Sequence, residues 1–157
     1  MRITFAGHAR LSYGTEVIAS LYERVKALRD EGGELTCYLG GYGSFDAACA
    51  AVCRKLKQEM GGVELVYVSP YRSLSEQAKI KDLLARGLYD ASLYPPIERT
   101  PARFAISKRN EWMVENADAV IVYVGHAYGG AYRSLRMAKA KGKRIFNLWM
   151  DKPCTVF

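Results

Sequence analysis

Two glycine-rich segments carry the clearest chemical signal in this sequence. The first reads Gly40-Gly41-Tyr42-Gly43, the second contains Gly129-Gly130, and each precedes a stretch with helical spacing. Glycines let backbone amides approach an anion closely, and the start of a helix adds free amides and a positive dipole end. A phosphate or carboxylate could be held there without a lysine. The alternative is that the glycines only make tight turns, but the repetition after a second strand favours a shared ligand cleft.

Polar and aromatic residues near these segments could complete the cleft. Asp46 lies in the first turn of the helix after the first segment, where it could accept hydrogen bonds from ribose hydroxyls or only favour the helix dipole. His8 could polarise or protonate a ligand near neutral pH, or only bond to the backbone. Arg10 could contribute charge to a phosphate or lie in solvent. Tyr42 and Tyr71 offer flat surfaces on which a base could stack.

Apolar spacing alternates between strand and helix along the chain. Strands are expected at 3–6, 35–39, 63–68, 119–124 and 144–150, and helices at 15–32, 45–60, 73–88, 102–116 and 130–141. This alternation predicts an α/β fold: one doubly wound, mostly parallel sheet with helices on both faces, forming a single domain over residues 1–157. Right-handed crossovers would bring every strand-to-helix loop to one edge of the sheet, where such folds bind ligands.

Some local details are also expected. Thr15 could cap the first helix. Residues 89–101 contain three prolines and read as an irregular loop, a kind of segment that often serves as a lid. The second helix should bury one stripe, formed by Phe45, Ala48, Cys49, Val52, Leu56 and Met60.

Composition narrows the class of protein. Lys and Arg outnumber Asp and Glu by 23 to 16, which gives a net charge of +7 and favours an anionic partner. No apolar run approaches the roughly 20 residues that cross a bilayer, and no signal peptide is recognisable, so we expect a cytoplasmic protein that does not enter membranes. The four cysteines include no C-x-x-C pair and the two histidines are far apart, so we expect reduced, packing cysteines and no metal site.

Two common nucleotide-binding motifs are absent. The dinucleotide fingerprint would place G-x-G-x-x-G in the first strand-to-helix turn, where this chain has only Gly7. No glycine loop ends in Gly-Lys-Ser or Gly-Lys-Thr, so there is no Walker-type loop. Any phosphate site here must therefore be of another type.

Three segments together resemble the SLOG superfamily, the Rossmann-like group that includes lonely-guy phosphoribohydrolases and DNA-processing protein A. The resemblance is nearest to small stand-alone bacterial and phage members, and its segments are 4–10, 38–46 and 110–123 followed by Gly129-Gly130-Ala131. It implies a nucleotide or nucleotide-derived ligand and suggests that Arg109 and Asn110 face the site. The full set of expected ligand-binding residues is Gly7, His8, Arg10, Gly40, Gly41, Tyr42, Gly43, Asp46, Tyr71, Arg109, Asn110, Gly129 and Gly130.

The sequence also departs from the family pattern. Ala9 separates His8 from Arg10, where relatives read Thr-Gly-His-Arg, so Arg10 is displaced from the usual position. Lonely-guy enzymes carry Pro-Gly-Gly-x-Gly-Thr-x-x-Glu with a catalytic acid, whereas this chain reads Gly-Gly-Ala-Tyr-Arg-Ser-Leu with no glutamate in reach. The departures argue against phosphoribohydrolase activity. A domain that binds or senses a nucleotide-derived ligand is therefore the preferred interpretation.

Two other functions stay open at this point. An N-glycosidase acting on a nucleoside monophosphate or NAD would need a carboxylate near the anomeric carbon, and Asp46, Glu111 and Asp118 are the candidates. A nucleic-acid-binding protein would use the positive charge, but the basic residues are spread along the chain and are densest only between Arg133 and Arg144. A homo-oligomer is compatible with either function.

Overall fold

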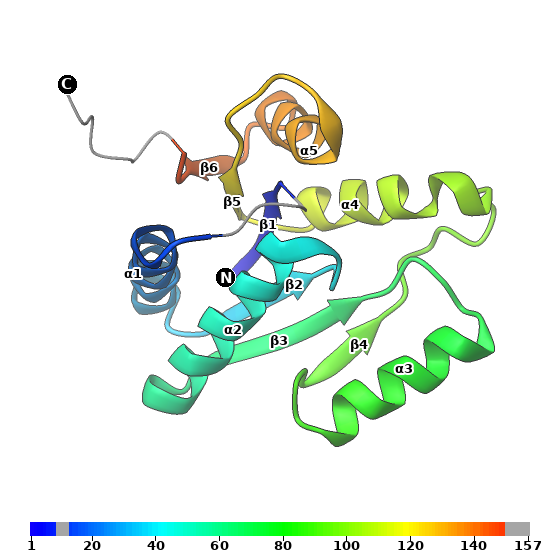
Figure 1. The fold of residues 1–157 in the computed structure, drawn as a ribbon, viewed down its shortest axis with the longest axis horizontal. Coiled ribbons are helices and arrows are strands. Elements are labelled where there is room, and N and C mark those ends of the chain that lie inside the picture. Colours follow the sequence, from blue (N-terminus) through cyan, green and yellow to red (C-terminus); the bar gives the residue numbers. More distant parts are fainter. Residues whose placement is uncertain (9–12, 150–157) are drawn as a thin grey trace.

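The computed structural model describes residues 1–8 and 13–149. A sheet of six parallel strands, in the order β4-β3-β2-β1-β5-β6, forms its centre (Figure 1). The strands are β1 (Arg2–Gly7), β2 (Leu35–Leu39), β3 (Val63–Val68), β4 (Ala91–Leu93), β5 (Ala119–Tyr123) and β6 (Arg144–Asn147). The predicted α/β fold with one doubly wound parallel sheet is confirmed.

The helices cover both faces of this sheet. They are α1 (Thr15–Gly32), α2 (Gly43–Met60), α3 (Leu74–Ala85), the short 3-10 turn η1 (Ala102–Phe104), α4 (Ala105–Glu115) and α5 (Gly129–Ala140). The chain builds outward from β1 to β4 and then returns to add β5 and β6 on the other side of β1. With right-handed crossovers, this reversal puts α1, α2 and α3 on one face and α4 and α5 on the other (Figure 1). The switch point, where α/β sheets bind ligands, lies between β1 and β5.

Strand β5 shows why the sheet holds together. All five of its residues are buried, and successive side chains of a strand point to opposite faces. Ile121 packs into the apolar cluster beneath α1 and α2, whereas Val120 and Val122 pack into the cluster beneath α5. A parallel strand covered on both faces needs apolar residues at every position, which explains the unbroken run in the sequence.

Two details at the helix ends differ from expectation. Gly14, not Thr15, is the N-cap of α1, and no side chain caps that end. In α2 the predicted stripe is buried at Phe45, Cys49, Val52 and Leu56 and partly buried at Ala48, but Met60 is 38% exposed. Met60 is the last residue of α2, and Gly61 turns the chain toward β3 immediately afterwards. It therefore lies past the part of the helix that packs on the sheet.

The expected loop at 89–101 contains a strand. Residues 91–93 form β4, which pairs with β3, and Asp90 supports the junction because its Oδ2 accepts from the amide of Leu65 at 2.8 Å. Three residues next to two prolines give too short a pattern to predict. At the other edge β6 ends at Asn147, earlier than expected, while Met150 lies outside the described residues.

Three of the four cysteines lie in the core. Cys37, Cys49 and Cys53 are free thiols buried between β2 and α2, and Cys154 lies outside the described residues. Within 1–8 and 13–149, no helix combines the length and apolar character needed to span a bilayer.

Replacing Leu56 by alanine tests the packing of α2 on the sheet. Leu56 is fully buried, so Leu56→Ala should lower the free energy of unfolding by about 2–5 kcal/mol. Met60→Ala, one turn along the same helix, should cost less than about 1 kcal/mol because that side chain is already partly in water. Urea unfolding of both variants measures the difference; equal losses would contradict this description of the core.

Candidate functional site

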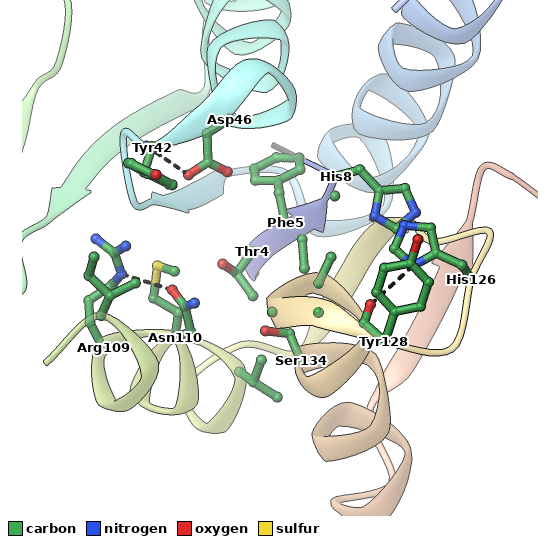
Figure 2. A pocket seen from close by; sticks show the side chains of 18 of the residues that line it. Thr4, Phe5, His8, Tyr42, Asp46, Arg109, Asn110, His126, Tyr128 and Ser134 are labelled. Carbon is green, nitrogen blue, oxygen red and sulfur yellow. Dashed lines mark hydrogen bonds between the residues drawn. The ribbon is translucent and has the colours of Figure 1, made fainter. Parts of the chain in front are cut away.

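A cleft of about 790 Å³ lies at the carboxyl ends of the central strands, beside the switch point (Figure 2). Its floor comes from β1 and His8, and its walls come from the starts of α2 and α5 and from α4. The side chains and backbone that line it include Thr4, Phe5, Ala6, Gly7, His8, Tyr42, Asp46, Ile106, Arg109, Asn110, Met113, Val114, His126, Tyr128, Gly129, Gly130, Ala131, Ser134 and Trp149. It is thus mostly apolar, with a few polar groups from separate elements.

The structure brings together most of the residues expected to bind a ligand. Those that line the cleft are Gly7, His8, Tyr42, Asp46, Arg109, Asn110, Gly129 and Gly130. Those that do not line it are Gly40, Gly41, Gly43 and Tyr71, and Arg10 lies outside the described residues.

Two of the three candidate carboxylates lie elsewhere. Glu111 does not line the cleft and pairs with Lys108 on α4 at 3.3 Å. The carboxylate of Asp118 accepts from the amide of Arg2 at 2.8 Å. Arg2 is the first residue of β1, so Asp118 lies at the amino ends of the strands, whereas the cleft lies at their carboxyl ends. Among the residues described, Asp46 is the carboxylate that lines the cleft.

Arg109 is a buried brace and not a solvated residue of α4. It is 2% exposed, and its Nη1 donates to the carbonyl oxygens of Gly40 at 3.0 Å and Val68 at 2.9 Å. Gly40 directly follows β2 and Val68 is the last residue of β3, so Arg109 joins the carboxyl ends of two neighbouring strands. A side chain at position 40 would put its Cβ 2.8 Å from the guanidinium carbon, so this glycine makes room for the brace.

The amides of the first glycine loop face the protein's own carboxylate. Asp46 Oδ2 accepts from the amide of Tyr42 at 3.3 Å (Figure 2). Burial raises the pKa of Asp46 to about 6, while hydrogen bonds from the backbone of Tyr42, Gly40 and Gly41 and the charge of Arg109 act in the opposite direction. A ligand anion placed at this loop would meet the carboxylate, so the loop offers the cleft an acceptor and not the anion site that the glycines suggested.

The start of α5 keeps the features of an anion site. Tyr128 is its N-cap residue and makes no side-chain cap, and the first turn carries no acid. Gly129 has φ of +89°, and a Cβ at Gly129 or Gly130 would meet nothing within 4 Å. Several amides of a helix's first turn lack partners within the helix. Here they open on the cleft together with the positive dipole end.

Three rings stack beside this helix start. His8 lies 3.8 Å from His126 between ring centroids, and His126 lies 3.8 Å from Tyr128 (Figure 2). The amide of Gly125 donates to His8 Nε2 at 3.1 Å, so this nitrogen carries no proton. Burial, and then the neighbouring His126, lower the pKa of His8. His8 is therefore a neutral ring at neutral pH, not a cation for a phosphate.

Sequence reasoning did not single out His126, Tyr128, Ser134 or Trp149. The signal available was position: His126 and Tyr128 lie in the loop between β5 and the Gly129-Gly130 pair. Ser134 lines the cleft about one turn into α5. Whether a residue at this position faces the cleft depends on the rotation of α5 about its axis, which the sequence does not give. No group of three or more metal-ligating His, Cys, Asp or Glu side chains occurs in the described part of the chain.

Comparisons with known proteins support the fold. No family model and no curated protein matches the chain. The solved structures that resemble it include DNA processing protein A (DprA) from Streptococcus pneumoniae, DNA processing protein A from Helicobacter pylori, and the structural genomics target TM1055.

The structural similarity extends over nearly the whole described chain, but the sequence identities are low. The Streptococcus protein gives a TM-score of 0.63 at 15% identity over 93% of this chain, and the Helicobacter protein gives 0.60 at 15% over 94%. TM1055 gives 0.58 at 16% over 92%. The chain spans about half of the first structure, with 49%, 64% and 71% of the three covered. At such identities the likeness establishes the fold, which is the Rossmann-like fold of DprA.

The environment of Asp46 predicts a specific pH dependence. Its pKa of about 6 in the folded protein lies above the ordinary 3.8, so the folded state keeps this proton longer than the unfolded state. The stability contributed by the protonated carboxyl should be present below pH 4 and should be lost as the pH rises through 6. Asp46→Asn removes this titration. We compare the free energy of unfolding of the variant with that of the native protein at pH 4.5 and at pH 7.5. The difference, variant minus native, should be larger at pH 7.5 by roughly 1–3 kcal/mol.

Urea unfolding at the two pH values measures this change. Asp82→Asn is the matched control, because Asp82 is exposed on α3. A difference between the Asp46 variant and the native protein that stays constant with pH would contradict the description of the Asp46 environment.

Proposed function

We propose that the cleft binds a nucleotide or nucleotide-derived ligand, with the phosphate at the start of α5. The observation that carries the proposal is the uncapped helix start at Gly129 and Gly130, which opens into a cleft at the β1–β5 switch point. Helix starts favour phosphates because their amides and dipole act on the same anion. The site needs no lysine and no metal for this task.

The rest of the cleft suits the remainder of such a ligand. A volume of about 790 Å³ is in the range of small-molecule sites. Phe5, Ile106 and Met113 line the cleft with apolar side chains, while Asp46 on α2 and Asn110 on α4 provide polar groups from two different walls. An apolar cleft with few convergent polar groups is typical of ligand-binding sites.

Binding is a better-supported function than hydrolysis of an N-glycosidic bond. Hydrolysis needs an acid to protonate the leaving base and a second group to position water or attack the sugar. Asp46 could serve one of these roles, but Glu111 and Asp118 lie away from the cleft. A cytoplasmic sensing or binding domain of the SLOG type is consistent with this arrangement.

Single-stranded DNA is a second candidate ligand. The Helicobacter DNA processing protein A is described by its single-stranded DNA binding mode, and this chain has its fold. The outer side of α5 exposes Arg133, Arg136 and Lys139 at three-residue spacing, and this helix contains no acid. Such a stripe could follow a phosphodiester backbone that passes the mouth of the cleft.

A substitution at Gly130 tests the nucleotide site. Gly130→Asp places a negative charge where the phosphate is proposed, and the same charge should stabilise the start of the helix slightly. We expect nucleotide affinity to fall at least tenfold with no loss of thermal stability. Isothermal titration calorimetry with AMP, GMP, ADP-ribose and NAD measures the affinity.

A glycine at another helix start gives the matched control. Gly14 is the N-cap of α1, does not line the cleft, and has open space around the position of a Cβ. Gly14→Asp should therefore leave binding unchanged. The proposal is wrong if none of the four compounds binds the native protein, or if Gly130→Asp binds them as tightly as the native protein does.

A double substitution tests the DNA alternative. If α5 binds single-stranded DNA, Arg133→Ala with Arg136→Ala should weaken binding and reduce the salt slope by about 1–2. Filter binding of an oligonucleotide at several salt concentrations measures both quantities. Lys55→Ala with Arg86→Ala removes equal charge from α2 and the end of α3 and should have no comparable effect. No binding at low salt would end this alternative.

A further inference from the structure

The protein fixes the hydrogen-bonding direction of Asn110 in the cleft wall. Arg109 Nε donates to Asn110 Oδ1 at 2.9 Å, and a guanidinium can only donate. Arg109 is itself held by the carbonyls of Gly40 and Val68, so it cannot turn away. The oxygen of the Asn110 amide therefore faces Arg109, and its NH2 group, which has no partner among the described residues, presents donors to the cleft (Figure 2).

Asp46 presents the opposite chemistry from the other wall. Its carboxylate accepts from the amide of Tyr42 and lines the cleft at the start of α2. A carboxylate has about four acceptor positions, and the backbone of Tyr42, Gly40 and Gly41 takes up to three of them, so one position remains for a donor of a bound ligand. Helices α2 and α4 cover opposite faces of the sheet, and Figure 2 shows Asp46 and Asn110 on either side of Thr4. A ligand lying over Thr4 would meet an acceptor on one side and a donor on the other.

The surface between these two groups suits a flat ring. Phe5 lies beside Asp46 in Figure 2, and Ile106 and Met113 lie on α4, the helix that carries Asn110, whereas Gly129 and Gly130 begin α5. A polyhydroxylated sugar would leave its hydroxyls against apolar side chains, whereas an aromatic base would not. The base of a nucleotide therefore fits the Asp46–Asn110 end when its phosphate lies at α5.

The purine bases differ in how they would meet these groups. Guanine carries acceptors on one edge, at O6 and N7, and donors on another, at N1 and the exocyclic N2. Adenine carries its donor N6 and its acceptor N7 on the same edge, and its N1 is a lone pair that would face the carboxylate. We propose that this cleft selects a guanine base, with Asp46 accepting from N1 or N2 and with Asn110 donating to O6 or N7. This assignment rests on the proposed nucleotide function and identifies the base.

The experiment compares three mononucleotides on the full chain. We expect calorimetry at pH 7.5 to give GMP an affinity about tenfold to a hundredfold higher than that of AMP, since charge-assisted hydrogen bonds are involved. IMP, which lacks the N2 amino group, should fall between them. Asp46→Asn should reduce the GMP-to-AMP ratio to about threefold or less, mainly by weakening GMP, and Asp82→Asn should leave the ratio unchanged.

A second variant keeps the test independent of any effect on folding at Asp46. Asn110→Asp retains an acceptor for Arg109 but replaces the donor that faces the base, so GMP affinity should fall at least tenfold. The assignment is overturned if AMP binds the native protein as tightly as GMP, or if both variants keep the native ratio. If GMP and AMP bind equally and Gly130→Asp weakens both, the base assignment fails while the nucleotide site stands. If no mononucleotide binds, both fail.

Discussion

The hydrogen bonds of Arg109 hold the cleft together. One buried guanidinium, carried by α4, pairs the terminal carbonyls of β2 and β3 through Gly40 and Val68 and also orients the amide of Asn110. Gly40 and Val68 are both buried, so removing the arginine would take a hydrogen bond from each of two buried carbonyl oxygens. The same charge lies close enough to Asp46 to oppose the rise in its pKa. Two walls of the cleft therefore depend on one side chain that is not itself free to bind a ligand anion.

The net charge of +7 says little about the cleft, because its charged groups already have partners in the protein. Arg109 is bonded to carbonyls, Asp46 faces the amides of its own loop, and burial together with His126 keeps His8 neutral. The glycine loop before α2 thus acts as a turn that receives a carboxylate. The uncapped start of α5 is left as the anion position, so backbone geometry and not surface charge determines where a phosphate would lie.

Much of the fold was predictable because its signals are local. Strand β5 is a run of consecutive apolar residues, and α2 has apolar residues at helical spacing. Both elements form where these patterns predict them. Strand β4 was missed because its three residues form a strand only by pairing with β3. The prediction that Thr15 caps α1 was wrong, because the N-cap residue is Gly14. Both residue types occur at helix starts, so the residue that becomes the N-cap depends on where the backbone enters the helix.

The sequence by itself determined the fold class, the edge of the sheet where a cleft would form, and eight of the nineteen described residues that line that cleft. Tertiary structure decided what these residues do. From the sequence alone, Arg109 could have been a solvated residue and Asp46 a residue that only favours the helix dipole. Burial and a partner 69 residues away make Arg109 a brace, and the fold of the glycine loop makes Asp46 an acceptor in the cleft. Local spacing sets which elements form, whereas a side chain's role depends on the groups that folding places against it.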